Sequence, residues 1–174
     1  MKSYINNHWR REEWLQREST DESNVNRYHS WINTSYSNAK TTLDIGMGDG
    51  RLVNRLRKDG IKAYGVDLRE TSNKNGLIIA NARFLPFRDN SFDVVTECML
   101  LADFDDFQDV PDEAYTQVID EVIRVLKPEG GFLTSPWLGL VGKCIINKDF
   151  KFSSGYAEYK KRDLIIVPCR YHAK

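Results

Sequence analysis

Short apolar runs alternate with helix-like periodicity along the middle of the chain. Runs typical of buried strands occupy 42–45, 62–68, 77–82, 92–100 and 130–137. Segments 51–60 and 111–127 instead place apolar residues three and four positions apart, the spacing of one helix face. Alternating strands and helices indicate βαβ units. We therefore expect an α/β fold with a mostly parallel sheet and helices on both faces, although the link at Glu70–Gly76 is too short and polar for a full helix.

The two ends of the chain follow other patterns. The polar, aromatic N-terminal part predicts two short helices, about Asn7–Glu18 and Glu22–Tyr36, with Ser19-Thr20-Asp21 as the break and N-cap. The strand-like segments 151–160 and 163–170 predict a C-terminal antiparallel hairpin. We expect one domain over 1–174, divided into an N-terminal helical cap (1–38), a central core (39–137) and a C-terminal hairpin region (138–174).

Composition narrows the function classes. The 174 residues carry 25 Lys and Arg against 25 Asp and Glu, so no net charge favours a nucleic acid or an anionic membrane. Three cysteines without a CxxC pair argue against a disulfide framework or a zinc site, and we expect no metal. The N-terminus lacks an apolar signal region, and no apolar run approaches the roughly 20 residues that span a bilayer. We expect a cytoplasmic protein.

The stretch "TTLDIGMGDGR", residues 41–51, is the main candidate for chemistry. Three alternate glycines follow a strand, at the edge of an open sheet where ligands bind. Glycine lets the main chain approach a ligand closely, and the amides at a helix start form a small anion site. A phosphate-binding P-loop is excluded because no Gly-Lys-Ser/Thr follows.

Two ligand classes remain for such a loop. A dinucleotide site requires G-x-G-x-x-G, but Arg51 occupies the last position, and Asp44 and Asp49 would repel a pyrophosphate. S-adenosylmethionine suits the loop better, because it combines one carboxylate with a positive charge and a ribose. Asp67 ends the next strand, at about the distance along the chain expected of a carboxylate that accepts from a ribose.

At this point the sequence resembles the class I S-adenosylmethionine-dependent methyltransferases, especially the broad small-molecule type. The resemblance covers about residues 41–136 and rests on four blocks in order: "LDIGMGDGRL", "YGVDL", "ANARFLPFRDNSFDVV" and "EVIRVLKPEGGFLTS". It implies a Rossmann-like sheet, with 39–137 as the cofactor-binding core.

The resemblance also implies a set of cofactor-binding residues. The loop positions that would shape the methionine and ribose pocket are Asp44, Gly46, Met47, Gly48 and Gly50. Asp67 would hold the ribose hydroxyls, Leu68 would pack on the adenine, and Asn81 and Ala82 would meet its polar edge. Thr96 and Glu97 would contact the methionine end. The family usually has aspartate where this chain has Asn81, whose amide oxygen can still accept from the adenine amino group.

Several side chains have more than one interpretation. Glu97 could contact the cofactor or substrate, act as a base or point to solvent. His29, on a possible lid helix, is a candidate base, whereas Asp93 is expected to orient the fourth strand. The acidic run 103–109 is a solvated loop or a wall for a cationic substrate. The aromatic residues of the N-terminal part fit helix packing or a substrate box; they are Trp9, Trp14, Tyr28, Trp31 and Tyr36.

We expect an S-adenosylmethionine-dependent methyltransferase whose acceptor is a small molecule, with no catalytic residue identified. A tRNA or protein acceptor remains an alternative. A methyltransferase-like module that binds or scaffolds without turnover is the rival from another class. A nicotinamide oxidoreductase is disfavoured by the glycine spacing.

Overall fold

The computed structural model describes residues 11–68, 77–97, 112–134, 156–160 and 163–166. The elements, in chain order, are α2 (Arg11–Ser35), β1 (Thr41–Ile45), α3 (Arg51–Lys58), β2 (Lys62–Asp67), β3 (Leu77–Ile79), β4 (Phe92–Glu97), α5 (Asp112–Val125), β5 (Leu126–Thr134), β6 (Tyr156–Lys160) and β7 (Asp163–Ile166). The expected link at 70–76 and the acidic run at 103–109 lie outside the described residues, as do all three cysteines.

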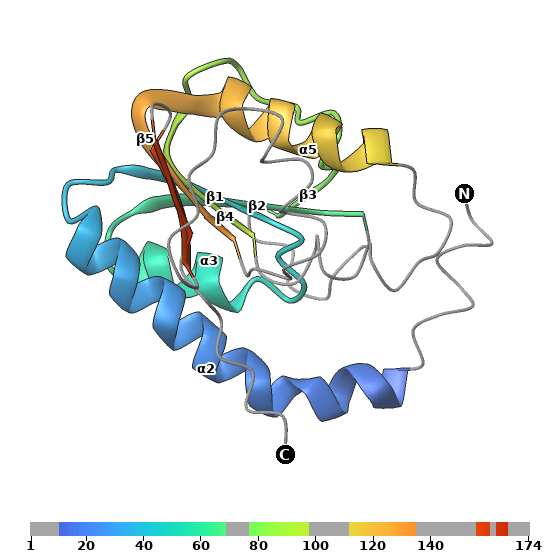
Figure 1. Cartoon of the computed structure of the whole chain (residues 1–174). Helices are drawn as coiled ribbons and strands as arrows, with labels where there is room; N and C mark the ends of the chain where they lie inside the picture. Colours follow the sequence, from blue (N-terminus) through green and yellow to red (C-terminus); the bar gives the residue numbers. More distant parts are fainter. Residues whose placement is uncertain (1–10, 69–76, 98–111, 135–155, 161–162, 167–174) are drawn as a thin grey trace.

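The strands form one sheet in the order β3-β2-β1-β4-β5-β6-β7 (Figure 1). The first five strands pair in parallel. β6 pairs antiparallel with β5, and β7 pairs antiparallel with β6. The sequence-based expectation of a mostly parallel α/β sheet is confirmed. β2 and β3 lie on one side of β1, and β4 and β5 lie on the other side.

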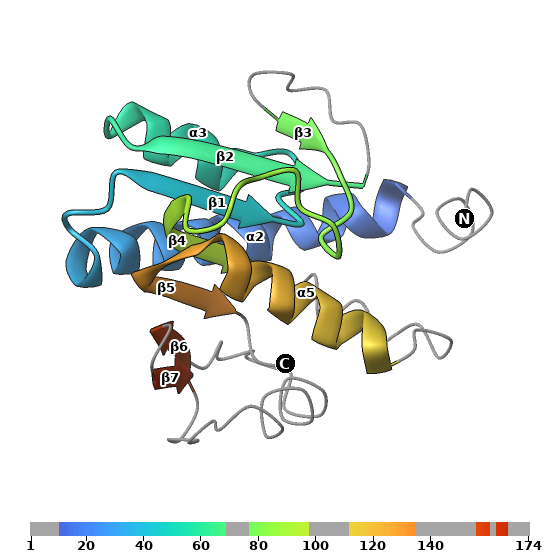
Figure 2. The same ribbon diagram turned by 90° about the horizontal axis from the view of Figure 1, so that it is seen from above.

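Helices cover both faces of the sheet (Figure 1; Figure 2 shows the same layers from above). On one face α2 and α3 form a buried cluster with the strands; its helical members are Tyr28, Ile32, Leu52, Val53 and Leu56. On the other face α5 packs against the sheet through Val118, Ile119, Val122 and Val125. The members from α3 and α5 are apolar positions of the helical stripes in the sequence, so the hydrophobic effect orients these two helices against the sheet.

The N-terminal part forms one continuous helix over its described residues, Arg11–Ser35, and the prediction of two helices with a break at Ser19-Thr20-Asp21 was wrong. Ser, Thr and Asp are favoured at caps, but inside a helix each costs well under about 1 kcal/mol. Without Gly or Pro in this segment, nothing in the backbone ends the helix.

The junction between α5 and β5 also differs from the expectation. α5 ends at Val125 and β5 begins at the next residue, Leu126, four residues before the predicted strand. Pro128 therefore lies within the strand, in the part where the pairing with β4 shifts register between Phe92 and Val94. Because proline cannot donate to a strand ladder, an irregular stretch of this kind is where it is tolerated.

Candidate functional site

The expected site residues meet where the parallel strands end. β1 lies between β2 and β4, and Asp44 pairs with Gly65 on one side and with Thr96 on the other. The carboxyl end of β1 is therefore the point at which strand order reverses. Ligands of open α/β sheets bind at this point.

The glycine loop joins β1 to α3 and is shaped by left-handed backbone. Gly46, Gly48 and Gly50 have φ angles of 69°, 56° and 78°. A residue with a Cβ is strained in this region, so the glycine spacing follows from the path of the chain. α3 starts from Gly50 without a side-chain cap.

Several amides of this loop are paired within the protein. The N–H groups of Gly46 and Met47 both donate to the carbonyl of Val66, at 2.9 and 3.2 Å. The N–H of Gly50 donates to the carbonyl of Met47 at 3.0 Å. These three amides therefore fasten the loop to β2 and to itself.

Asp67 joins the loop to the end of β2. Its Oδ2 accepts a hydrogen bond from the N–H of Gly48 at 3.1 Å, and its side chain is largely buried. Leu68 follows directly and is 47% exposed, although it is a large apolar residue. A carboxylate fixed against the glycine loop thus lies beside an open apolar surface.

Asp44 and Thr96 lie side by side in the centre of the edge. The Thr96 hydroxyl donates to Asp44 Oδ1 at 2.7 Å, and both side chains are buried. The remaining acid of the loop, Asp49, pairs with Arg51: its Oδ2 lies 2.8 Å from Arg51 Nε. The loop therefore carries one buried carboxylate and one that is neutralised locally.

Glu97 is fully buried, with 0% of its surface exposed, so the interpretation that it points to solvent was wrong. Its carboxylate accepts a hydrogen bond from the hydroxyl of Thr134, its pairing partner on β5. Its main-chain carbonyl accepts from the hydroxyl of Tyr28 on α2, at 2.8 Å. Sequence reasoning had placed Tyr28 only within an aromatic set and Thr134 only within the block "EVIRVLKPEGGFLTS", because no local pattern links either residue to Glu97.

Met47 contributes to the core rather than presenting its side chain at the surface. Its side chain is buried and packs over Gly65, where an added Cβ would lie 2.1 Å from the Met47 sulfur. Only glycine at position 65 leaves room for this contact. Met47 therefore shapes the loop by packing its buried side chain against β2.

The loop after β3 carries Asn81 and Ala82 next to the end of β2. The N–H of Ala80 donates to the carbonyl of Asp67 at 2.9 Å, which holds the two strand ends together. The side chain of Asn81 is partly buried, and its Oδ1 accepts from the N–H of Arg83 at 3.0 Å. Ala82 is buried among the core residues that face α5.

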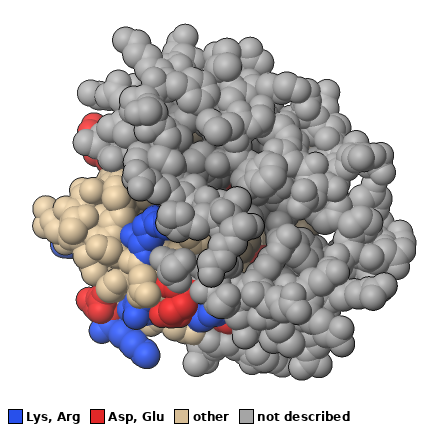
Figure 3. Space-filling view, turned by 60° about the horizontal axis from the view of Figure 1, so that its bottom comes forward, with Lys and Arg blue, Asp and Glu red and all other residues tan. Residues whose placement is uncertain are grey.

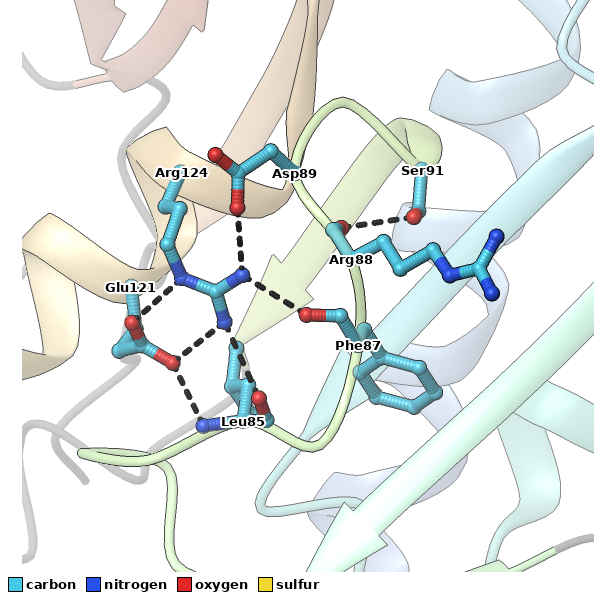
Figure 4. Close-up of polar contacts among 7 residues, drawn as sticks. All are labelled: Leu85, Phe87, Arg88, Asp89, Ser91, Glu121 and Arg124. Atoms are coloured by element: carbon cyan, nitrogen blue, oxygen red, sulfur yellow. Dashed lines mark hydrogen bonds and ion pairs between the residues drawn. The ribbon is translucent and has the colours of Figure 1, made fainter.

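Helix α5 holds the rest of this loop through a clamp made by Glu121 and Arg124 (Figure 4). Glu121 Oε2 accepts from the N–H of Leu85 at 2.6 Å, and Arg124 donates to the carbonyls of Leu85 and Phe87 at 3.0 and 2.7 Å. Arg124 also pairs with both oxygens of Glu121, at 2.7 Å each, and with Asp89. The hydrogen bond from Arg124 lowers the pKa of Glu121, outweighing the effect of burial.

Two other candidates lie at the opposite, amino edge of the sheet. His29, named as one candidate base, contacts the carboxylate of Asp59, which follows α3. Asp93, which was expected to orient the fourth strand, lies in β4 and accepts from the N–H groups of Lys40 and Thr41 at the start of β1. Burial opposes its charge, but hydrogen bonds from Lys127, Lys40 and Thr41 together lower its pKa to about 2.

On the face drawn in Figure 3, the described residues place Lys or Arg and Asp or Glu side chains next to each other. Among the described residues, no helix is long and apolar enough to cross a membrane. The same part of the chain holds no group of three His, Cys, Asp or Glu side chains arranged to bind a metal ion.

A family model described as a methyltransferase domain matches residues 43–134, which is over half of the chain and includes every site residue above except Tyr28. The chain belongs to this methyltransferase domain family. The matched segment is the one that builds β1 to β5, the glycine loop and α5. The expected family, the class I S-adenosylmethionine-dependent methyltransferases, is therefore confirmed, and with it the cofactor class.

Curated relatives of this methyltransferase domain have diverse names. This chain is 32% identical over 100 residues to the mitochondrial arginine-hydroxylase NDUFAF5 of Mus musculus, and the match covers 52% of this chain and 27% of that protein. It is 33% identical over 121 residues to the ubiquinone/menaquinone biosynthesis C-methyltransferase UbiE of Brucella suis, covering 60% and 42%. The chain thus spans less than half the length of either relative.

Solved structures share the fold. The PH0226 protein of Pyrococcus horikoshii OT3 is 25% identical, with a TM-score of 0.55 over 65% of this chain and 56% of that one. The 1,6-didemethyltoxoflavin-N1-methyltransferase of Burkholderia thailandensis, crystallised with its acceptor and S-adenosylhomocysteine, is 16% identical, with a TM-score of 0.56 over 92% and 70%. The second likeness concerns the fold alone.

Proposed function

We propose that this chain binds S-adenosylmethionine at the carboxyl edge of β1, β2 and β4 and transfers its methyl group to a small-molecule acceptor. The observation that carries the proposal is the contact between Asp67 and Gly48, which places a carboxylate beside the glycine loop at the switch point. The Asp67 carboxylate would also accept hydrogen bonds from the ribose hydroxyls. Charge-assisted hydrogen bonds of this kind are among the strongest available to a neutral sugar.

The buried carboxylates at this edge fit S-adenosylmethionine better than a dinucleotide. Asp44 and Glu97 are both buried at the ends of neighbouring strands, where their charges favour a cationic ligand group. The ammonium and sulfonium of S-adenosylmethionine meet this requirement, whereas a pyrophosphate would be repelled. Leu68, half exposed, offers an apolar surface for the adenine.

The protein's part in the reaction is mainly positional. When bound, the cofactor supplies a methyl group on a sulfonium, which is already a good leaving group. The chain's residues then fix the donor: the loop and Asp67 hold the ribose, and the strand ends hold the methionine. Alignment of two reactants can supply several kcal/mol of the barrier, about 7–11 in favourable cases.

A small-molecule acceptor is supported by the neutral composition of the chain. The UbiE relative is named a C-methyltransferase of ubiquinone and menaquinone biosynthesis, and the Burkholderia enzyme is named a 1,6-didemethyltoxoflavin N1-methyltransferase. The NDUFAF5 relative, named an arginine hydroxylase, favours a second candidate: a protein that uses this fold without methyl transfer. Formation of S-adenosylhomocysteine in the presence of an acceptor distinguishes the two.

Calorimetric titration with S-adenosylhomocysteine tests the site directly, using the wild type and Asp67→Ala. Each hydrogen bond that the ribose donates to this charged acceptor is worth about 1.5–3 kcal/mol, so its loss should weaken binding at least about tenfold. Asp59→Ala is the control, because Asp59 is likewise a carboxylate with a partner in the protein but lies at the opposite edge. Unchanged affinity in Asp67→Ala would remove Asp67 from the site.

A further inference from the structure

The side-chain oxygen of Asn81 accepts a hydrogen bond from within the protein. Asn81 Oδ1 accepts a hydrogen bond from the N–H of Arg83 at 3.0 Å. A main-chain N–H requires an acceptor, so this contact fixes which end of the amide carries the oxygen. The other end, Nδ2, can only donate, and no residue that the structure describes accepts from it in a contact we observe.

Helix α5 holds the loop in the conformation that sets this orientation. The Arg83 side chain donates to Gln117 Oε1 at 2.5 Å, and the N–H of Leu85 donates to Glu121 at 2.6 Å. The N–H of Phe84 donates to the carbonyl of Asn81 at 2.9 Å, which closes the turn. Reversing the amide would set two donors, Nδ2 and the N–H of Arg83, against each other.

The main chain just before Asn81 is bonded to the main chain of the residue proposed to hold the ribose. Asp67 pairs with Ile79 across β2 and β3, and its carbonyl accepts from Ala80, the residue before Asn81. The half-exposed Leu68 continues from Asp67 on the same edge. A purine attached to a ribose at Asp67 has this loop and Leu68 as its neighbours.

Resting on the proposed function, we infer that Asn81 presents a hydrogen-bond donor to the six-position of the purine. This differs from the sequence-based expectation that its oxygen accepts from the adenine amino group. Adenine carries a donor at that position, so it gains no hydrogen bond there. Hypoxanthine carries a carbonyl, which accepts from Nδ2. Asn81 therefore gives no selection for adenine over hypoxanthine, whereas a carboxylate at position 81 would accept from the adenine amino group and provide it.

The test compares S-adenosylhomocysteine with S-inosylhomocysteine, its deaminated analogue, by calorimetric titration. The measured quantity is the ratio of the two Kd values in the wild type, in Asn81→Asp and in Asn81→Ala. Asn81→Asp keeps an oxygen for the N–H of Arg83 and replaces the donor by an acceptor. Asn38→Asp makes the same chemical change at an exposed position before β1 and serves as the control.

The wild type and Asn38→Asp should bind the two ligands within a few-fold of each other. Asn81→Asp should favour the adenine ligand at least about tenfold more than the wild type does, the equivalent of one hydrogen bond. Asn81→Ala, which lacks the donor, should weaken S-inosylhomocysteine more than S-adenosylhomocysteine, and it tests the inference even if the aspartate variant unfolds. Equal ratios in the wild type and the Asn81 variants would overturn the inference. Failure of the wild type to bind either ligand would instead overturn the proposed function.

Discussion

The hydroxyl of Tyr28 donates a hydrogen bond of 2.8 Å to the main-chain carbonyl of Glu97. The two residues are 69 positions apart, and the contact joins helix α2 to the end of β4. Glu97 is also the residue whose carboxylate accepts from Thr134 on β5. The N-terminal helix is thus fastened to the strand end at which the proposed cofactor's methionine part would lie.

Replacing Tyr28 by phenylalanine keeps the buried ring and removes this hydrogen bond. The free energy of unfolding should fall by about 1–2 kcal/mol, because the hydroxyl is lost and a buried carbonyl loses its donor. S-adenosylhomocysteine should also bind several-fold more weakly, because the end of β4 is less firmly positioned. Denaturant unfolding and calorimetric titration measure the two effects.

Tyr64→Phe is the matched control, since the Tyr64 ring packs in an aromatic cluster with Phe87 and Phe92 on the other face of the sheet. It should leave ligand affinity unchanged. A Tyr28→Phe variant with lower stability but wild-type affinity would show that the contact is structural only.

Gly50 and Gly60 provide a matched pair for the glycine loop. Both have left-handed backbone, with φ angles of 78° and 83°, so alanine should cost about 1–2 kcal/mol at each. At Gly50 an added Cβ would also lie 3.2 Å from the Leu77 side chain, whereas nothing lies within 4 Å at Gly60. Gly50→Ala should therefore be more destabilising, by up to about 1 kcal/mol, in denaturant unfolding. Equal losses would mean that Leu77 moves aside without cost.

Much of the fold could be predicted from the sequence because its signals are local. Apolar runs and helical stripes located the strands from β1 to β5 and the helices α3 and α5. The order of the motif blocks placed Asp44, Asp67 and the glycines at one edge, because successive parallel strands end on the same side.

The errors arose where a local preference was overruled or where a contact is distant in sequence. Ser19-Thr20-Asp21 matches a helix N-cap, yet the helix continues through it. The bond between Tyr28 and Glu97, and the bond between Glu97 and Thr134, join residues 69 and 37 positions apart, so no local pattern reveals them. Which end of the Asn81 amide is occupied depends on the turn made by Arg83, which residue type alone does not determine.

The low pKa of Asp93 predicts a pH-dependent part of the stability. Because the folded pKa, about 2, lies below the ordinary 3.8, the stabilisation is present above about pH 4 and is lost as the pH falls toward 2. The difference corresponds to about 2 kcal/mol. Asp93→Asn should therefore be less stable at neutral pH and should lose less stability between pH 4 and pH 2. Denaturant unfolding across this range measures both, and parallel curves would contradict the assignment.

The clamp between α5 and the loop after β3 predicts that the free energy of unfolding depends on the guanidinium group of Arg124, and that lysine does not replace it. Arg124→Lys removes the planar fork that spans Glu121 and the carbonyls of Leu85 and Phe87. The free energy of unfolding should fall by about 1–3 kcal/mol. Arg88→Lys is the control: Arg88 is exposed on the same loop and points away from the clamp (Figure 4), so its loss should stay within about 0.5 kcal/mol. Similar losses in both variants would show that the clamp adds little.

The central claim, binding of S-adenosylmethionine at the carboxyl edge, is tested most directly by thermal unfolding with S-adenosylmethionine, S-adenosylhomocysteine or NAD in separate samples. A ligand at 100 times its Kd stabilises the folded state by about 2.7 kcal/mol, which raises Tm by roughly 5–10 °C for a chain of this size. We predict this shift with the two adenosyl sulfur ligands and none with NAD. A shift with NAD alone, or with none of the three, would contradict the account.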